Sequence, residues 1–244
     1  MTKRSTAPRG TSRPGPLDEQ ERPLTPVAAA AVTAVVRATK ERAGRIEASL
    51  LVHSSARGLT RTLGACSRHR DPLYELPIAA IAITRIGLGA PGSPVRRDPP
   101  RLLLAEELPD CCRAAADPQG IARRFGPNDL NSFIADFSGG RGAGQILVAH
   151  SLRAELLPAL EAAGVDPTGV VARGVDLIGV AGYLWEEEVA AVRERDLGAE
   201  PLGLAALSGL GDRMGGTMIE RLRATELAFA RLWGGLWSLA HERA

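Results

Sequence analysis

Apolar residues recur three and four positions apart in two long segments near the ends of this chain. In residues 26–54 most of them are aliphatic, and in residues 217–243 they include Trp233 and Trp237. This spacing places such residues on one face of a helix. We therefore expect an all-α, mainly helical protein built as a multi-helix bundle. An α/β fold with a small sheet is the alternative.

Two segments keep that alternative open. The run 76–88 is apolar and rich in β-branched residues, so strand and buried helix compete, and we favour helix. In residues 170–184 three glycines each cost a helix about 1 kcal/mol relative to alanine. Beyond residue 100 we expect helices over 102–116, 119–125, 129–137, 145–163, 169–195 and 217–243.

Proline, glycine and charge divide the chain into four regions. Residues 1–24 have almost no apolar content and predict a disordered basic tail. A Thr-Pro pair, typical of a helix start, then opens residues 25–90, a long basic amphipathic helix and a following helical segment. Residues 91–100 indicate a Pro-rich linker or loop, and residues 101–244 a helical domain.

Basic residues are concentrated in the first part of the chain. Residues 1–70 carry 13 Lys+Arg and 5 Asp+Glu, a balance of +8, whereas residues 71–244 carry 17 and 23, a balance of −6. Such asymmetry fits a basic region that binds nucleic acid or an acidic protein, and it fits equally a solvated surface or two ends that attract each other within one protein or an oligomer. We expect a non-catalytic binding or regulatory protein, with Arg37 and Arg45 of the first helix among its contacts.

Residues 120–134, GIARRFGPNDLNSFI, resemble a helix-turn-helix motif. In that motif a turn glycine, here Gly126, lets two helices pack so that the second can enter a DNA major groove. Pro127 and Asp129 depart from the pattern, and an ordinary helical corner is the alternative. The resemblance implies base contacts by Asn128, Asn131 and Ser132, and phosphate contacts by Arg123 and Arg124.

A glycine-rich loop at residues 138–145, SGGRGAGQ, is a candidate small-molecule site. Glycines let backbone N–H groups approach a phosphate, although Gln145 and Ile146 stand where a P-loop has Lys and Ser/Thr. The alternative function is therefore an enzyme with a pocket for a small molecule or phosphate ligand. Its candidate residues are Gly139, Gly140, Arg141, Gly142, Gly144 and His150.

The sequence lacks the residue patterns that metal binding and nucleophilic catalysis need. The 3 cysteines and 4 histidines have no zinc-site spacing, so we expect no metal site and no cofactor. His150 and Ser151 are neighbours, which on a helix point about 100° apart, so we assign no catalytic residues. We expect the adjacent cysteines Cys111 and Cys112 to be inert free thiols.

The remaining expectations concern location and assembly. No apolar run reaches the roughly 18–20 residues that cross a bilayer, so we expect no membrane span. The low cysteine count favours the cytoplasm. Trp233 and Trp237 lie one helical turn apart and fit either the core or a homo-oligomer interface. A third function is therefore a structural protein that self-associates through its C-terminal helix.

Overall fold

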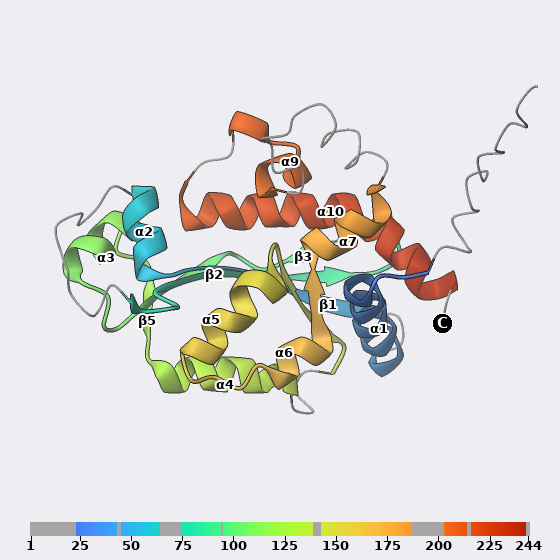
Figure 1. The fold of residues 1–244 in the computed structure, drawn as a ribbon, viewed down its shortest axis with the longest axis horizontal. Coiled ribbons are helices and arrows are strands. Elements are labelled where there is room, and N and C mark those ends of the chain that lie inside the picture. Colours follow the sequence, from blue (N-terminus) through green and yellow to red (C-terminus); the bar gives the residue numbers. More distant parts are fainter. Residues whose placement is uncertain are drawn as a thin grey trace, which may run out of the picture.

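A seven-stranded mixed sheet forms the centre of the protein, with helices on both faces (Figure 1). The computed structural model describes residues 23–42, 45–63, 75–93, 95–138, 143–186, 203–213 and 216–242. The all-α prediction is therefore wrong, and the alternative of an α/β fold is confirmed. Most of the predicted disordered tail, residues 1–22, lies outside the described residues.

The sheet combines an antiparallel and a parallel part. Its strand order is β5-β4-β2-β1-β6-β7, and β3 pairs with β2. Strands β1, β2 and β4 are antiparallel neighbours, whereas β6 is parallel to β1 and β7, and β5 is parallel to β4. The strands are β1 (Ile46–Ser54), β2 (Ala80–Leu88), β3 (Arg96–Arg97), β4 (Arg101–Ala105), β5 (Arg123–Phe125), β6 (Gln145–Ala149) and β7 (Gly174–Asp176).

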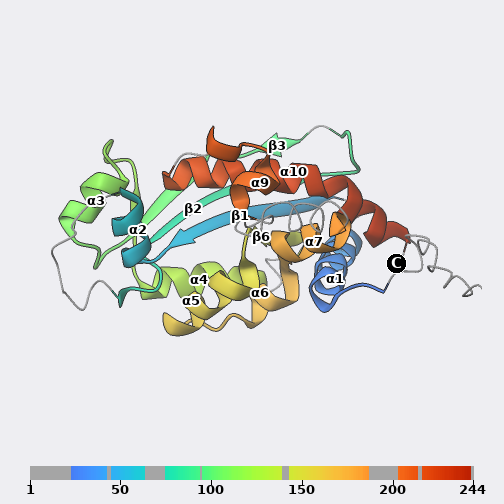
Figure 2. The same ribbon diagram turned by 45° about the horizontal axis from the view of Figure 1, so that its top comes forward.

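Helices form a layer on each side of the sheet. The long helix α10 and the short α9 lie over one face, and α4, α5 and α6 lie over the other (Figures 1 and 2). The α-helices are α1 (Pro26–Glu41), α2 (Ala56–Leu63), α3 (Asp110–Ala116), α4 (Pro127–Ser138), α5 (Leu157–Ala162), α6 (Thr168–Arg173), α7 (Leu177–Leu184), α9 (Leu204–Ser208) and α10 (Met218–Glu242). A π-helical turn, Leu152–Leu156, precedes α5, and a 3-10 turn, Gly211–Arg213, follows α9.

The predicted long N-terminal helix ends much earlier than expected. It begins as predicted, since Pro26 is its first residue and the Thr25 hydroxyl accepts a hydrogen bond from the N–H of Ala28 at 3.2 Å. It ends at Glu41, and residues 46–54 form β1 instead. The β1 sequence, IEASLLVHS, alternates apolar and polar residues from Ile46 to His53 except at Leu51, which is a strand pattern. The three-and-four spacing of its aliphatic residues was therefore misleading.

Several other predicted helices contain strands. Residues 76–88 contain β2, and the helices predicted over 102–116, 119–125 and 145–163 contain β4, β5 and β6. The Pro-rich segment 91–100 includes β3 and connects β2 to β4, which are adjacent strands of one sheet. It is a loop within the fold. The helices predicted over 129–137 and 217–243 are confirmed as α4 and α10.

Within residues 170–184 a short strand separates two helices. Strand β7 starts at Gly174, where an added Cβ would collide with the Leu152 side chain and the backbone oxygen of Val170. Gly179 lies in α7, where an added Cβ would collide with Val27 of α1. Both glycines therefore permit close packing between backbone and neighbouring side chains, which in α7 offsets the weak helix propensity of Gly179.

The two cysteines of α3 differ. Cys112 is buried and free, as predicted, but Cys111 is disulfide-bonded. The prediction of a free thiol is therefore wrong for Cys111. Among the helices described, none has both the length and the apolar character needed to span a membrane.

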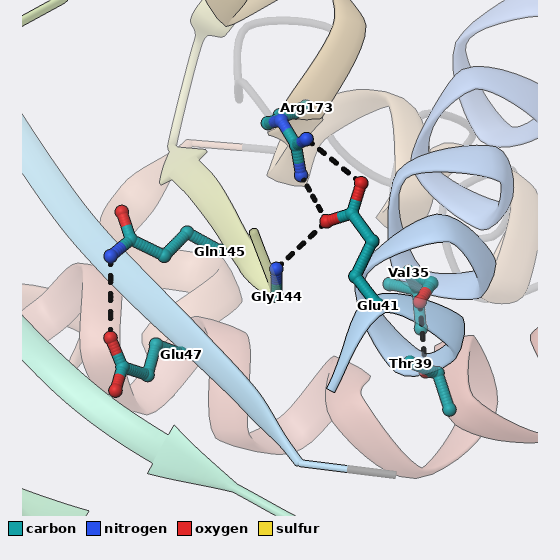
Figure 3. Close-up of polar contacts among 7 residues, drawn as sticks. All are labelled: Val35, Thr39, Glu41, Glu47, Gly144, Gln145 and Arg173. Atoms are coloured by element: carbon teal, nitrogen blue, oxygen red, sulfur yellow. Dashed lines mark hydrogen bonds and ion pairs between the residues drawn. The ribbon is translucent and has the colours of Figure 1, made fainter. Parts of the chain in front are cut away.

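Glu41, the last residue of α1, joins three elements that are distant in sequence (Figure 3). Its carboxylate accepts hydrogen bonds from the Arg173 guanidinium of α6 at 2.7 and 2.9 Å. It also accepts one from the N–H of Gly144, next to β6, at 2.8 Å. The hydrogen bond from Arg173 is the main cause that lowers the pKa of Glu41 to about 2, against the opposing effect of burial. The ionised carboxylate therefore holds α1, α6 and the start of β6 together.

The packing of α1 on α7 predicts opposite effects for two similar substitutions. Gly179→Ala places a methyl group against Val27 and should lower the free energy of unfolding by about 1–3 kcal/mol. Gly234→Ala in α10 meets no atom within 4 Å and should raise it by up to about 1 kcal/mol, because alanine favours helix. Urea unfolding measures the free energy of unfolding of both variants. Equal effects of the two substitutions would contradict this packing.

The Glu41 interactions predict a pH-dependent loss of stability. Glu41→Gln should lower the free energy of unfolding by about 2 kcal/mol at pH 7, because it removes charge-assisted hydrogen bonds. The folded pKa lies below the ordinary 4.5, so the stabilisation is present above pH 4.5 and is lost as the pH falls towards 2. Urea unfolding at several pH values between 7 and 2 should show the free energies of unfolding of Glu41→Gln and of the unsubstituted protein converging as the pH falls. Glu107→Gln, at an exposed site, is the control.

Candidate functional site

Three adjoining hollows form a continuous groove across the sheet. The largest, about 790 Å³, lies where β1 begins and β2 ends, and it shares Glu47, Gly87 and Arg96 with a hollow of about 140 Å³. That second hollow shares Arg85 and Asp98 with a third of about 110 Å³, which extends towards β5 and α4. We call this depression the arginine groove, after its lining residues Arg42, Arg45, Arg85, Arg96, Arg101 and Arg123.

The register of β2 explains why several of these arginines lie together. Ile83, Arg85 and Gly87 alternate along β2 and therefore share one face of the sheet. Residues directly opposite on neighbouring strands share that face too. Arg96 of β3 is opposite Gly87, and Arg101 of β4 is opposite Ile83. Arg85, Arg96 and Arg101 thus converge from three strands.

The same register separates Arg123 from its neighbour Arg124. Arg123 is opposite Leu103 of β4 and lies on the face of the groove, whereas Arg124 is opposite Leu104 and lies on the other face. That other face is covered by α10, since Arg97 of β3 forms an ion pair with Glu226 of α10. Arg85, Arg96, Arg101 and Arg123 therefore lie on the face opposite α10.

Arg42 and Arg45 enter the groove from the connection between α1 and β1. Arg42 pairs with Glu47 at 3.5 Å, and Glu47 also accepts a hydrogen bond from the Gln145 side chain at 3.3 Å (Figure 3). Gly144 has a φ of +70°, and an added Cβ there would collide with the Arg42 side chain. The backbone beside β6 thus packs directly against Arg42 at the rim.

The groove carries excess positive charge. Six arginines and three carboxylates, Glu41, Glu47 and Asp98, line it, and Glu41 is already paired with Arg173. All six arginines are exposed, and five of them, all but Arg42, make no side-chain hydrogen bond or ion pair with any described residue. Positive charge in a concave surface concentrates the local potential and attracts anions.

The lining suits binding better than proton transfer. It includes no histidine or cysteine among the residues that the structure describes, and its Thr84 hydroxyl donates to the backbone oxygen of Asp98 at 2.7 Å. His53 lies in β1, outside the lining, where burial, helped by the Arg221 charge, lowers its pKa to about 4. Within the described part of the chain, no group of three acidic, histidine or cysteine side chains could hold a metal ion.

The predicted nucleic-acid contacts are divided between the groove and other surfaces. Arg45 and Arg123 line it, whereas Arg37 is exposed on α1 outside the lining. The helix-turn-helix interpretation is wrong, because residues 123–125 form β5 rather than a helix. Asn128, Asn131 and Ser132 are exposed on α4, and the Ser132 hydroxyl donates to the backbone oxygen of Asn128 at 2.8 Å.

The predicted ligand loop does not form one pocket with His150. Gly144 immediately precedes β6 and His150 immediately follows it, so the strand separates them by about 20 Å. Gly139, Gly140, Arg141 and Gly142 lie outside the described residues. A ligand-binding role for this loop stays a prediction.

The paired tryptophans of α10 contribute to intramolecular packing. Trp233 is 7% exposed and its indole N–H donates to the backbone oxygen of Gly89 at 3.1 Å. Trp237 packs on Trp233 and stacks on His241, with ring centroids 5.5 and 4.1 Å away. Self-association through this helix stays a prediction, and of the two tryptophans the partly exposed Trp237 is the one that offers it a surface.

Four arginines of the groove were not identified from the sequence: Arg42, Arg85, Arg96 and Arg101. Arg85 offered a signal, since it is the one charged residue in the apolar run 76–88 and the one exposed residue of β2. A charge that interrupts a buried strand indicates a point where the sheet reaches solvent.

Comparisons with known proteins provide no assignment. The chain matches no protein-family model, no curated protein and no solved structure.

Proposed function

We propose that the protein is a non-catalytic binding protein that holds single-stranded nucleic acid in the arginine groove. One observation carries the proposal: five exposed arginines without side-chain partners among the described residues converge on a hollowed sheet face. Guanidinium groups suit phosphate because they present several N–H donors in a planar fork. Contacts to phosphates supply most of the affinity in such complexes.

The length of the groove favours a chain of phosphates over a single anion. It reaches from the start of β1 to β5, which stands three strands away, and neighbouring strands are about 4.8 Å apart. With the distance along β2 added, the arginines extend over about 20 Å. An extended polyanion can contact arginines at both ends of this groove, whereas one small anion cannot.

The arginines of the groove favour a single strand over a duplex. Ile46 and Leu88, which line the largest hollow, are only 1% and 8% exposed and offer bases no surface. The exposed arginines supply the base contacts instead, because guanidinium planes can stack on the base faces that a single strand exposes and a duplex hides. The sheet thus offers both backbone and base contacts, as other sheet-based single-strand binders do.

This proposal keeps the nucleic-acid partner expected from the sequence, but it moves most of the binding surface away from the basic N-terminal region. Arg42 and Arg45 belong to the basic first 70 residues, but the remaining groove arginines come from β2–β5. An acidic protein is the competing partner, and the experiment below separates the two. A regulatory role, a cytoplasmic location and homo-oligomer formation are not needed for this proposal and stay predictions.

Fluorescence anisotropy with a labelled oligothymidine of about 20 nucleotides tests the proposal. The protein should bind it at about 50 mM salt, and the affinity should fall steeply as salt rises because counterions are released. Replacing both Arg96 and Arg123 with alanine should weaken binding. It should also reduce the slope of log affinity against log salt by about 0.7 for each arginine.

Arg124→Ala is the matched control. Arg124 neighbours Arg123 but lies on the other face of β5, so this variant should retain both the affinity and the salt slope. No binding at low salt, an equal loss in Arg124→Ala, or tighter binding of polyglutamate than of the oligonucleotide would each contradict the proposal. Point variants are needed because deletion of residues 1–70 would remove β1 from the centre of the sheet.

A further inference from the structure

Two of the three groove carboxylates lie in the middle of a groove that otherwise favours anions. The middle hollow, about 140 Å³, is lined by Glu47 and Asp98 together with Arg85, Arg96 and Gly87. A surface that bound phosphates alone would be weakened by negative charge at this position, because like charges repel. The carboxylates therefore indicate that this hollow receives a different part of the ligand.

Asp98 is the carboxylate available for a ligand. Its backbone is fixed, because its N–H donates to the oxygen of Arg85 at 2.8 Å and its oxygen accepts from the Thr84 hydroxyl at 2.7 Å. Its side chain makes no hydrogen bond or ion pair with a described residue. By contrast, Glu47 is engaged by Arg42 and Gln145. Asp98 thus presents two free acceptor oxygens on a rigid backbone.

An ionised carboxylate accepts hydrogen bonds and cannot donate them, and this decides which base it recognises. Guanine offers two adjacent donors on its Watson–Crick edge, N1–H and the N2 amino group, so both oxygens of one carboxylate can be used. Adenine and cytosine offer one amino group beside an acceptor nitrogen. Thymine and uracil place one N–H between two carbonyl oxygens, which the carboxylate repels. Guanine is therefore the best match.

The surroundings of Asp98 fit a base rather than a phosphate group. Arg85 and Arg96 line the same hollow, and guanidinium planes stack on bases. The adjoining hollow of about 790 Å³ leaves room for the sugar and phosphate that accompany the base. We propose that the hollow between Asp98, Arg85 and Arg96 is a guanine pocket within the arginine groove. This inference rests on the proposed function.

Base preference tests the pocket. Oligothymidines of about 20 nucleotides are compared by anisotropy, each unchanged or carrying one central guanine or one central adenine. The protein should bind the guanine oligonucleotide about tenfold more tightly than the unchanged one, as expected for a bidentate base contact. Asp98→Asn should bind the unchanged oligonucleotide at least as well as before and lose the guanine preference. Asparagine pairs well with adenine, so adenine should then equal or exceed guanine.

Two controls keep the result interpretable. Glu107→Gln removes an exposed carboxylate outside the groove lining and should keep the guanine preference. Inosine lacks the N2 amino group, so an inosine oligonucleotide should lose much of the preference with the unmodified protein. This second measurement does not depend on the folding of a variant.

The outcomes separate the two proposals. No binding of any oligonucleotide would overturn the proposed function. Tight binding with equal affinity for all bases would overturn only the guanine pocket, and so would an unchanged guanine preference in folded Asp98→Asn. A shift of preference from guanine towards adenine is not expected from a purely structural role of Asp98.

Discussion

The central position of β1 is the constraint on which the rest of the structure depends. This strand pairs with antiparallel β2 on one side and with parallel β6 on the other, so it joins the two parts of the sheet. Most of its residues are buried, and its hydrophobic side chains therefore contribute to packing on both faces of the sheet. Because β1 begins at Ile46, helix α1 ends before it, at Glu41. The short connection between them brings Arg42 and Arg45 to the edge of the sheet where β2 ends.

The pairing register then decides what the exposed face carries. A slip of one residue along β2 would move its side chains to the opposite face, because strand side chains alternate. Arg85 would then point towards the layer of α10, where the sheet is covered, and an apolar residue would take its place in the groove. The buried residues on either side of Arg85, Thr84 and Ile86, hold this register. Packing of the core thus determines that the Arg85 charge lies on the groove face of the sheet.

Parts of this architecture could be predicted from the sequence and parts could not. Helices α1, α4 and α10 have local signals, namely an N-cap followed by proline, or an apolar stripe flanked by charge. Strand β2 lacks a clear local signal, because burial on both faces removes most of the alternation that identifies a strand. Strand β1 does alternate from Ile46 to His53 except at Leu51, but the three-and-four spacing of its aliphatic residues concealed this signal. Arg45 and Arg123 were identified as nucleic-acid contacts, but Arg123 was placed on a helix that does not exist. Their convergence depends on strand order, which short-range spacing does not encode.

The ion pair at the rim helps to keep the groove positive. An unpaired Glu41 would add a third negative charge and repel an incoming phosphate. Arg173 neutralises it from α6, outside the lining, so the groove arginines need not do so. Glu47 is less favourable, since it pairs with Arg42 and thereby reduces the charge that Arg42 offers to a ligand. Arg45, Arg85, Arg96, Arg101 and Arg123 therefore carry most of the attraction, and Asp98 remains the one groove carboxylate without a partner among the described residues.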